Sequence, residues 1–167
     1  MEKVVIYGNG PVAHTAYLKL KHDSPYQVVA FTVDEAYIKA ESMNDLPLVP
    51  FGDVAERYPP DEYQMLIAVG YVGVNKVRAG RYQMAREMGY QLISNVSSMA
   101  MVAPDLVMGD NCMINAQTMV SPFVRIGSNV IIGAGSFIGH DVVIGDHCFI
   151  GDRVAIAGSV TIEPYCF

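Results

Sequence analysis

A six-residue repeat in the C-terminal part of the sequence restricts the fold more than any other feature. Every sixth residue from position 102 onward is apolar, and all but Met108 in this series are β-branched. The series consists of Val102, Met108, Ile114, Val120, Ile126, Ile132, Ile138, Ile144, Ile150, Ile156 and Ile162. A fixed period over this length indicates a solenoid of stacked units.

Two other positions of the repeat are also restricted. The residue after each apolar residue is usually glycine or alanine, and the residue two before it is small or branched. One short strand per repeat and a tight turn give a three-sided coil of about 18 residues, whose aliphatic side chains stack at the ~4.8 Å strand spacing. The spacing predicts a parallel β-helix over residues 96–167. Cys112, Cys148 and Cys166 fall at the second inward position, so we expect buried hydrophobic thiols rather than metal ligands.

The N-terminal part of the chain shows a different pattern. Apolar runs at 3–7, 27–33, 65–70 and 90–93 predict strands, and the segments 14–21 and 74–88 predict helices. Such alternation is typical of an α/β domain with a parallel sheet. We therefore predict an α/β Rossmann-like N-terminal domain with a parallel sheet over residues 1–95, followed by an all-β parallel β-helix domain over residues 96–167.

The first predicted strand runs into a glycine turn of the form G-x-G-x-x-A. Gly8, Asn9 and Gly10 would offer backbone N–H groups to phosphates. Asp34, at the end of the second predicted strand, could bond a ribose hydroxyl. The simpler alternatives are a tight turn without a ligand and an acid that merely ends a strand. Because a full dinucleotide fold needs about six strands, this short domain favours a nucleotide-linked substrate over NAD.

Composition narrows the classes of function. The net charge of −6 and the lack of a basic patch argue against a nucleic-acid partner. The N-terminus has no signal-peptide features, and no apolar run reaches the ~18 residues that a membrane span needs. We therefore expect a soluble, cytoplasmic protein with no membrane partner and no metal. Since the repeat runs to Phe167 without a polar cap, we also expect the native chain to continue beyond this residue.

Three segments carry a resemblance to a known family. They are the residues 5–11, the residues 68–70 followed by Asn75 and Arg78, and the residues 138–146. The whole chain resembles the nucleotide-sugar N-acetyltransferases of bacterial surface-glycan synthesis and their sialic-acid O-acetyltransferase relatives. The resemblance implies a left-handed β-helix, a homotrimer, and transfer of an acetyl group from acetyl-CoA to the amine of a nucleotide-linked amino sugar.

The resemblance also implies roles for individual residues. His140 would be the general base, and Asp141 would orient its imidazole. Ala157 and Gly158 would lie along acetyl-CoA. The nucleotide-sugar substrate would bind at Gly8, Asn9, Gly10, Asp34 and Gly70. Some members of the family carry a second histidine near the thioester, and this chain has Phe149 at that place.

The repeat itself supports His140 as a functional residue. His140 lies two residues after the inward Ile138, so its side chain should point out of the prism. One coil further along the chain stands Gly158, which has no side chain. A groove beside an outward imidazole would suit the thin pantetheine arm of acetyl-CoA. A surface histidine without a role is the simpler alternative.

Three other functions stay open. An O-acetyltransferase acting on a sialic-acid-type sugar would use the same histidine chemistry, and its acceptor would distinguish it. A non-catalytic scaffold would bind a nucleotide sugar but not acetyl-CoA. An NAD-dependent oxidoreductase would bind the reduced cofactor, and the short first domain counts against it.

Overall fold

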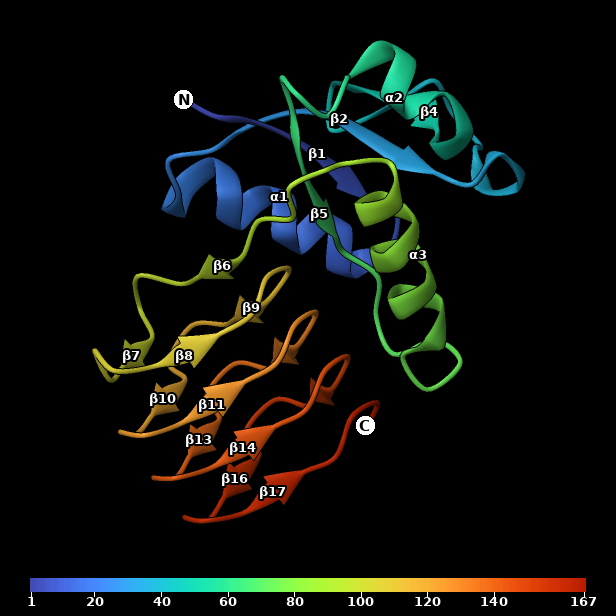
Figure 1. The fold of residues 1–167 in the computed structure, drawn as a ribbon. Coiled ribbons are helices and arrows are strands. Elements are labelled where there is room, and N and C mark those ends of the chain that lie inside the picture. The colour runs from blue at the N-terminus through green and yellow to red at the C-terminus, as the bar shows by residue number, and fades with distance from the viewer. The chain divides into compact units, whose positions relative to one another are not determined.

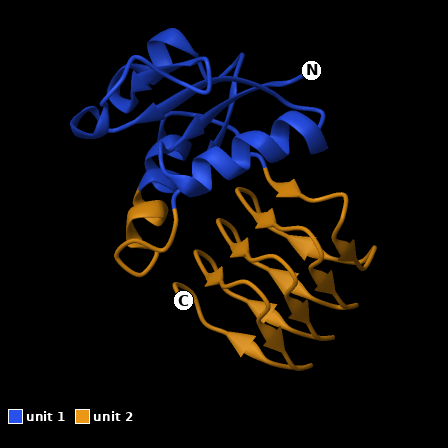
Figure 2. Cartoon of the chain, turned by 180° about the vertical axis from the view of Figure 1, so that it is seen from behind, with its two compact units in different colours: residues 1–69, 81–93 blue, residues 70–80, 94–167 orange.

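The computed structural model describes residues 1–167 and separates them into two compact units (Figure 2). The first unit contains residues 1–69 and 81–93, and the second contains residues 70–80 and 94–167. Each unit has its own hydrophobic core. The assignment of separate functions to residues 1–95 and 96–167 stays a prediction.

The first unit is built around a five-stranded sheet with the order β3-β4-β2-β1-β5. Its core strands are almost entirely apolar and buried, as in β1, and its helix α1 contacts both β1 and β2 (Figure 1). In chain order the elements are β1 (Lys3–Tyr7), α1 (Pro11–Asp23), β2 (Gln27–Val33), η1 (Glu35–Tyr37), β3 (Ser42–Met43), β4 (Leu46–Pro50), η2 (Phe51–Asp53), α2 (Val54–Arg57), β5 (Gln64–Ile67) and α3 (Lys76–Glu87). The helix α3 begins in the second unit and continues into the first.

The helix α1 begins earlier than the predicted helix. Gly10 is its N-cap and Pro11 occupies its first position. Proline is favoured there because its missing N–H would have no partner in the first turn anyway. The glycine turn therefore leads directly into the helix N-terminus, as the sequence pattern requires.

The prediction of a Rossmann-like domain with a parallel sheet is wrong. β3 pairs antiparallel with β4, so the sheet is mixed. A Rossmann fold also needs repeated strand–helix alternation, and here only β1 and β2 are joined by a long helix, while η1, η2 and the four-residue α2 fill the later connections. The predicted strand at 90–93 is absent as well, because Leu92 forms only an isolated bridge with Met65.

Two residues of the sequence explain the antiparallel hairpin. Asn44 and Asp45 connect β3 to β4 and both have positive φ, at 51° and 62°. Asparagine and aspartate tolerate this left-handed region because their short polar side chains bond locally. The chain therefore reverses within two residues and returns beside itself, where a parallel sheet would require a helical crossover.

The second unit is a left-handed parallel β-helix whose coils stack along one axis (Figure 1). Its three faces are four-stranded parallel sheets with the orders β16-β13-β10-β7, β17-β14-β11-β8 and β15-β12-β9-β6. All its strands have two residues: β6 (Asn95–Val96), β7 (Met101–Val102), β8 (Val107–Met108), β9 (Met113–Ile114), β10 (Met119–Val120), β11 (Arg125–Ile126), β12 (Ile131–Ile132), β13 (Phe137–Ile138), β14 (Val143–Ile144), β15 (Phe149–Ile150), β16 (Ala155–Ile156) and β17 (Thr161–Ile162).

The register of these sheets follows the predicted coil length. Ile138 pairs with Val120 on the preceding coil and with Ile156 on the following coil. Ile138, Ile144 and Ile132 are fully or almost fully buried, and they belong to one continuous core. The β-helix and its inward aliphatic stack are therefore as predicted.

The corners of the β-helix show a second six-residue period that the sequence analysis did not identify. One residue at every corner from 111 to 165 has a φ between +52° and +69°. These residues are Asn111, Gln117, Phe123, Asn129, Gly135, Asp141, His147, Arg153, Ser159 and Tyr165. The left-handed backbone turns the chain sharply between two faces, and it fixes where the side chains on either side of the turn point.

The cysteines follow the prediction only in part. Cys112 and Cys148 are buried, and burial raises the pKa of the Cys112 thiol to about 12. Cys166 is exposed, so the prediction that it is buried is wrong. No helix has both the length and the apolar character to cross a membrane.

Candidate active site

His140 and Asp141 form a hydrogen-bonded pair at an exposed corner of the β-helix, just after β13. The imidazole Nδ1 lies 2.9 Å from Asp141 Oδ2. Asp141 has a φ of +57°, and this bend brings two consecutive side chains to the same side of the chain. The side chains are 66% and 56% exposed, so a substrate can reach them from solvent. The pair has the arrangement in which a carboxylate fixes the tautomer of a base.

Gly158 lies against the imidazole on the next coil. A Cβ atom added at Gly158 would be 2.5 Å from His140 Nε2, which no side chain could occupy without displacing the ring. The coils are held together here by a hydrogen bond from the Ser159 N–H to the His140 carbonyl, at 2.8 Å. The predicted contact between an outward imidazole and a bare backbone is therefore present, and Ala157 beside it is exposed.

The coil before His140 contributes a hollow that the sequence analysis missed. The Asp141 N–H donates to the Pro122 carbonyl at 3.2 Å, so Pro122 is the neighbour on that side. Next to it, Asp141 lines a hollow together with Asp105, Val107, Phe123, Val124 and Arg125. The available signal was the coil length, which places residues 105 and 123 in the same corner column as residue 141.

The glycine turn of the first unit has the geometry of a tight strand–helix connection. Gly8 has a φ of +128°, and a Cβ atom there would be 2.6 Å from the Ala68 carbonyl oxygen, so only glycine fits. Gly10 is open, with nothing close to its missing Cβ. The Asn9 side chain donates to the Tyr37 carbonyl at 2.9 Å. The structure thus brings this turn close to the segment that follows β2.

Asp34 follows β2 and is already paired within its own unit. Its Oδ1 accepts a hydrogen bond from the Tyr7 hydroxyl at 2.9 Å, and its Oδ2 forms an ion pair with Arg81. Arg81 Nε also donates to the Tyr7 oxygen at 2.9 Å. Burial raises the pKa of Tyr7 to about 12, and the bond to Asp34 raises the pKa of Arg81. The sequence analysis missed this trio because Arg81 is 47 positions from Asp34.

Gly70 lies in the second unit, where its carbonyl accepts a hydrogen bond from Arg78 at 3.4 Å. Arg78 is fully buried, and its guanidinium donates to the carbonyls of Asn129, His147 and Cys148 at 2.9–3.2 Å. Burial lowers the pKa of Arg78 to about 10. The arginine thus fastens the segment 70–80 to the coils of the β-helix.

Phe149 occupies the place where some members of the resembled family carry a second histidine, and its surroundings are aromatic. The Phe149 ring lies 5.4 Å from Tyr71 and 5.7 Å from Phe167, measured between ring centroids. The Arg78 guanidinium lies 5.9 Å from the Phe149 centroid. Phe149 has no group that could accept or donate a proton.

A comparison with protein-family models gives a match in the β-helix alone. Residues 105–140 match the bacterial transferase hexapeptide, a model of six repeats. The match ends at His140 and covers the coils that carry Pro122 and Phe123. No curated protein sequence matches the chain.

Solved structures with the same fold cover almost the whole chain. Perosamine N-acetyltransferase from Caulobacter crescentus, in complex with CoA and GDP-perosamine, has a TM-score of 0.77 and 20% identity, over 97% of this chain and 83% of the other. The acetyltransferase domain of PglB from Neisseria gonorrhoeae has a TM-score of 0.70 and 17% identity, over 100% of this chain and 91% of the other. At these identities the similarity establishes the fold alone.

Proposed function

We propose that this protein transfers an acetyl group from acetyl-CoA to the amine of a nucleotide-linked amino sugar. The observation that carries the proposal is the exposed His140–Asp141 pair with Gly158 against the imidazole. Two similarities support it. The structure of perosamine N-acetyltransferase contains CoA and GDP-perosamine, and that enzyme has also been crystallised as variants with one histidine replaced.

In the proposed reaction, His140 acts as the general base. The amine nitrogen attacks the thioester carbonyl carbon while Nε2 takes its proton. Asp141 holds Nδ1–H and stabilises the imidazolium that forms. The carbon–sulfur bond then breaks, and the imidazolium proton goes to the departing thiolate. The Gly158 backbone lies against the imidazole, and in the proposed reaction its N–H binds the oxyanion.

The other predicted residues complete the proposal. Ala157 and Gly158 would line the path of acetyl-CoA. The backbone N–H groups at Asn9 and Gly10 lie at a helix N-terminus, which suits phosphate groups. The Gly8 N–H already donates to the Thr32 carbonyl at 2.8 Å, so Gly8 would contribute to substrate binding by shaping the turn. Asp34 and Gly70 would contact the rest of the nucleotide sugar. The proposal includes a homotrimer that works in the cytoplasm in bacterial surface-glycan synthesis.

The proposal is tested by following release of the CoA thiol with acetyl-CoA and a panel of nucleotide sugars. The panel contains GDP-perosamine and UDP-glucosamine, each with its hydroxyl counterpart in place of the amine. We expect thiol release with at least one amino sugar and not with its hydroxyl counterpart. Transfer only to hydroxyl groups would favour an O-acetyltransferase, and nucleotide-sugar binding without thiol release would favour a scaffold.

A further inference from the structure

The hollow beside Asp141 is an independent feature of the β-helix surface. It has a volume of about 310 Å³ and lies on the side of the candidate pair opposite to Gly158. Its floor is the buried Val124. Its walls come from a corner column and from the sheet face beside it, where Arg125 is paired with Val107 of the preceding coil.

Phe123 in this hollow is not explained by the stability of the fold. Its side chain is 66% exposed, so it contributes little hydrophobic burial. It also has a φ of +65°, a conformation that bulky residues rarely adopt. Its backbone N–H is held by Asp105 Oδ2 at 2.8 Å, which fixes the turn and keeps the ring directed outward. Every corner of the β-helix has this conformation, so the fold requires the turn but does not require a large aromatic ring at it.

Arg125 supplies the free charge of the hollow. It is exposed, and its guanidinium has neither an ion pair nor a hydrogen bond. Its neighbours in the ladder, Val107 and Val143, are apolar and offer it no partner. The two carboxylates of the hollow are engaged through one oxygen each, Asp141 by His140 and Asp105 by the Phe123 N–H. Each therefore keeps a second oxygen as an acceptor.

This combination matches the chemistry of a sugar ring. The polarised C–H groups on one face of a hexose suit the negative face of an aromatic ring. Its hydroxyl groups can accept hydrogen bonds from a guanidinium and donate to carboxylate oxygens. A second copy of the chain, docking through an apolar surface, would instead cover Arg125 without pairing its charge, which is costly. The volume also lies at the lower end of the range typical of small-molecule sites.

We infer that the hollow holds the hexose ring of the acceptor, with Phe123 stacked on the sugar and Arg125 bonded to its hydroxyl groups. The inference rests on the proposed function and assigns the two substrates to opposite sides of His140, acetyl-CoA at Gly158 and the sugar at Phe123. Neither Phe123 nor Arg125 takes part in proton transfer. Both are positioning residues that determine affinity for the acceptor.

The test compares Phe123→Asn and Arg125→Gln with the wild-type protein, using the amino sugar that supports thiol release. Asparagine tolerates positive φ, so Phe123→Asn should fold at least as stably as the wild type. We expect kcat/KM for the amino sugar to fall about 10-fold in Phe123→Asn and about 10–100-fold in Arg125→Gln. The KM for acetyl-CoA should not change in either variant.

Matched controls come from other corners of the same β-helix. Tyr165 has the same backbone conformation as Phe123, with a φ of +65°, and Arg153 is an exposed arginine like Arg125. Neither residue lines the hollow. Tyr165→Asn and Arg153→Gln should therefore keep the wild-type kcat/KM. If Phe123→Asn and Arg125→Gln behave like these controls, the sugar site is refuted while the acetyltransferase stands. A change in oligomer mass in Phe123→Asn would refute it in favour of an interface between copies. If the wild-type protein releases no thiol with any amino sugar, the proposed function fails, and the sugar site with it.

Discussion

Two corners of the β-helix carry a histidine each, and the same repeat gives them opposite properties. At one corner, His140 is exposed and its Nδ1 faces the Asp141 carboxylate. At the other, His147 is half-buried and its Nδ1 lies 2.8 Å from the Asn129 side-chain nitrogen. Because an amide nitrogen can only donate, His147 must accept at Nδ1 and is held as the neutral tautomer.

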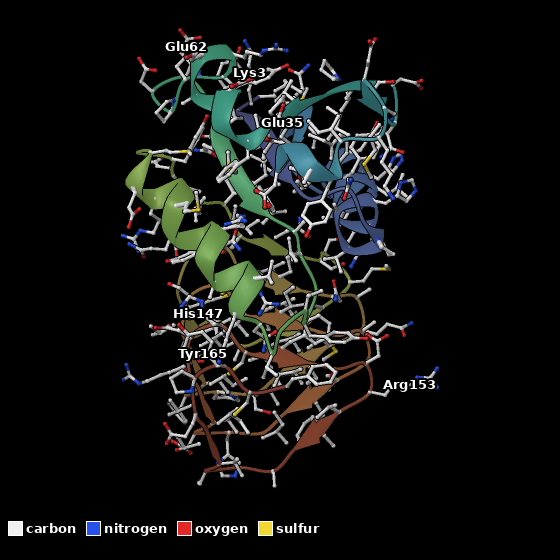
Figure 3. The ribbon with its side chains drawn as sticks, turned by 90° about the vertical axis from the view of Figure 1, so that its right-hand side faces the viewer. Lys3, Glu35, Glu62, His147, Arg153 and Tyr165 are labelled. Atoms are coloured by element: carbon white, nitrogen blue, oxygen red, sulfur yellow. The ribbon has the colours of Figure 1, made fainter.

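The surroundings of the second corner account for the difference. Asn111, Asn129 and His147 occupy one column, and the buried Arg78 donates both to Asn129 Oδ1 and to the His147 carbonyl. The ring centroids of His147 and Tyr165 are 4.8 Å apart. Figure 3 shows these two residues close together and Arg153 away from them. The repeat thus provides the same backbone at every corner. Whether the side chains at a corner are buried and hydrogen-bonded within the fold or exposed to solvent depends on which other residues pack over that corner.

The largest expected effect separates the two histidines by activity. His140→Asn should lower turnover about 10²–10⁴-fold, because a positioned general base contributes a factor of this size. His147→Asn should keep turnover, since asparagine suits the left-handed corner and no reacting group is near it. Thiol release with acetyl-CoA and the accepted amino sugar measures both. Equal losses in the two variants would remove the distinction between the corners.

The second prediction concerns the arginine that covers the His147 corner. Arg78→Met removes the donor to the carbonyls of Asn129, His147 and Cys148, and we expect the free energy of unfolding to fall by about 3–5 kcal/mol. Arg153→Met, at an exposed corner, should change it by less than about 0.5 kcal/mol. Urea unfolding of the two variants provides the measurement. Similar stabilities would mean that the buried hydrogen bonds of Arg78 make no net contribution to the free energy of unfolding.

The sequence predicts those parts of the molecule that depend on local spacing. The strict period of six was sufficient to predict that Ile138 is buried, that His140 points outward and that Gly158 lies next to it on the following coil, because each coil repeats the preceding one. The left-handed corners have the same period, but the sequence does not reveal them, because residues as different as Phe123, Asp141 and Arg153 occupy them. Periodicity of hydrophobicity is visible in a sequence, whereas periodicity of φ is hidden when the side chains vary.

Contacts between residues far apart in the chain could not be predicted from the sequence. Asp34 was correctly placed after the second strand, but its pairing with Arg81 depends on how α3 packs in the first unit. The carbonyls that bind Arg78 likewise come from two coils, Asn129 on one and the consecutive residues His147 and Cys148 on the next. The antiparallel pair in the mixed sheet had a local sequence signal, the turn residues Asn44 and Asp45. The prediction of a parallel sheet followed the alternation of strands and helices instead, and it was wrong.

The smallest expected effect is a difference in acid stability between the two corners. Burial lowers the pKa of His147 below its usual 6.5, with nearby Arg78 acting in the same direction and Asp146 against it. The folded protein therefore favours the neutral imidazole. Above pH ~6.5 the imidazole is neutral in both the folded and the unfolded state, and this contribution to stability is complete. As the pH falls below ~6.5, the unfolded chain binds a proton that the folded protein does not bind, so stability is lost until the pH passes the lowered pKa of the folded state.

Unfolding in urea between pH 7.5 and 5 would reveal this contribution as a difference between variants. Carboxylates titrate in wild type and variant alike, so their effect cancels when the two curves are subtracted. Wild type should lose more stability than His147→Asn as the pH falls, because asparagine keeps a neutral acceptor for Asn129 at every pH. Parallel curves would show that protonation of His147 costs nothing in the fold. The buried corner would then differ from the exposed one in packing alone, and the hydrogen bond from Asn129 would not be what holds the imidazole neutral.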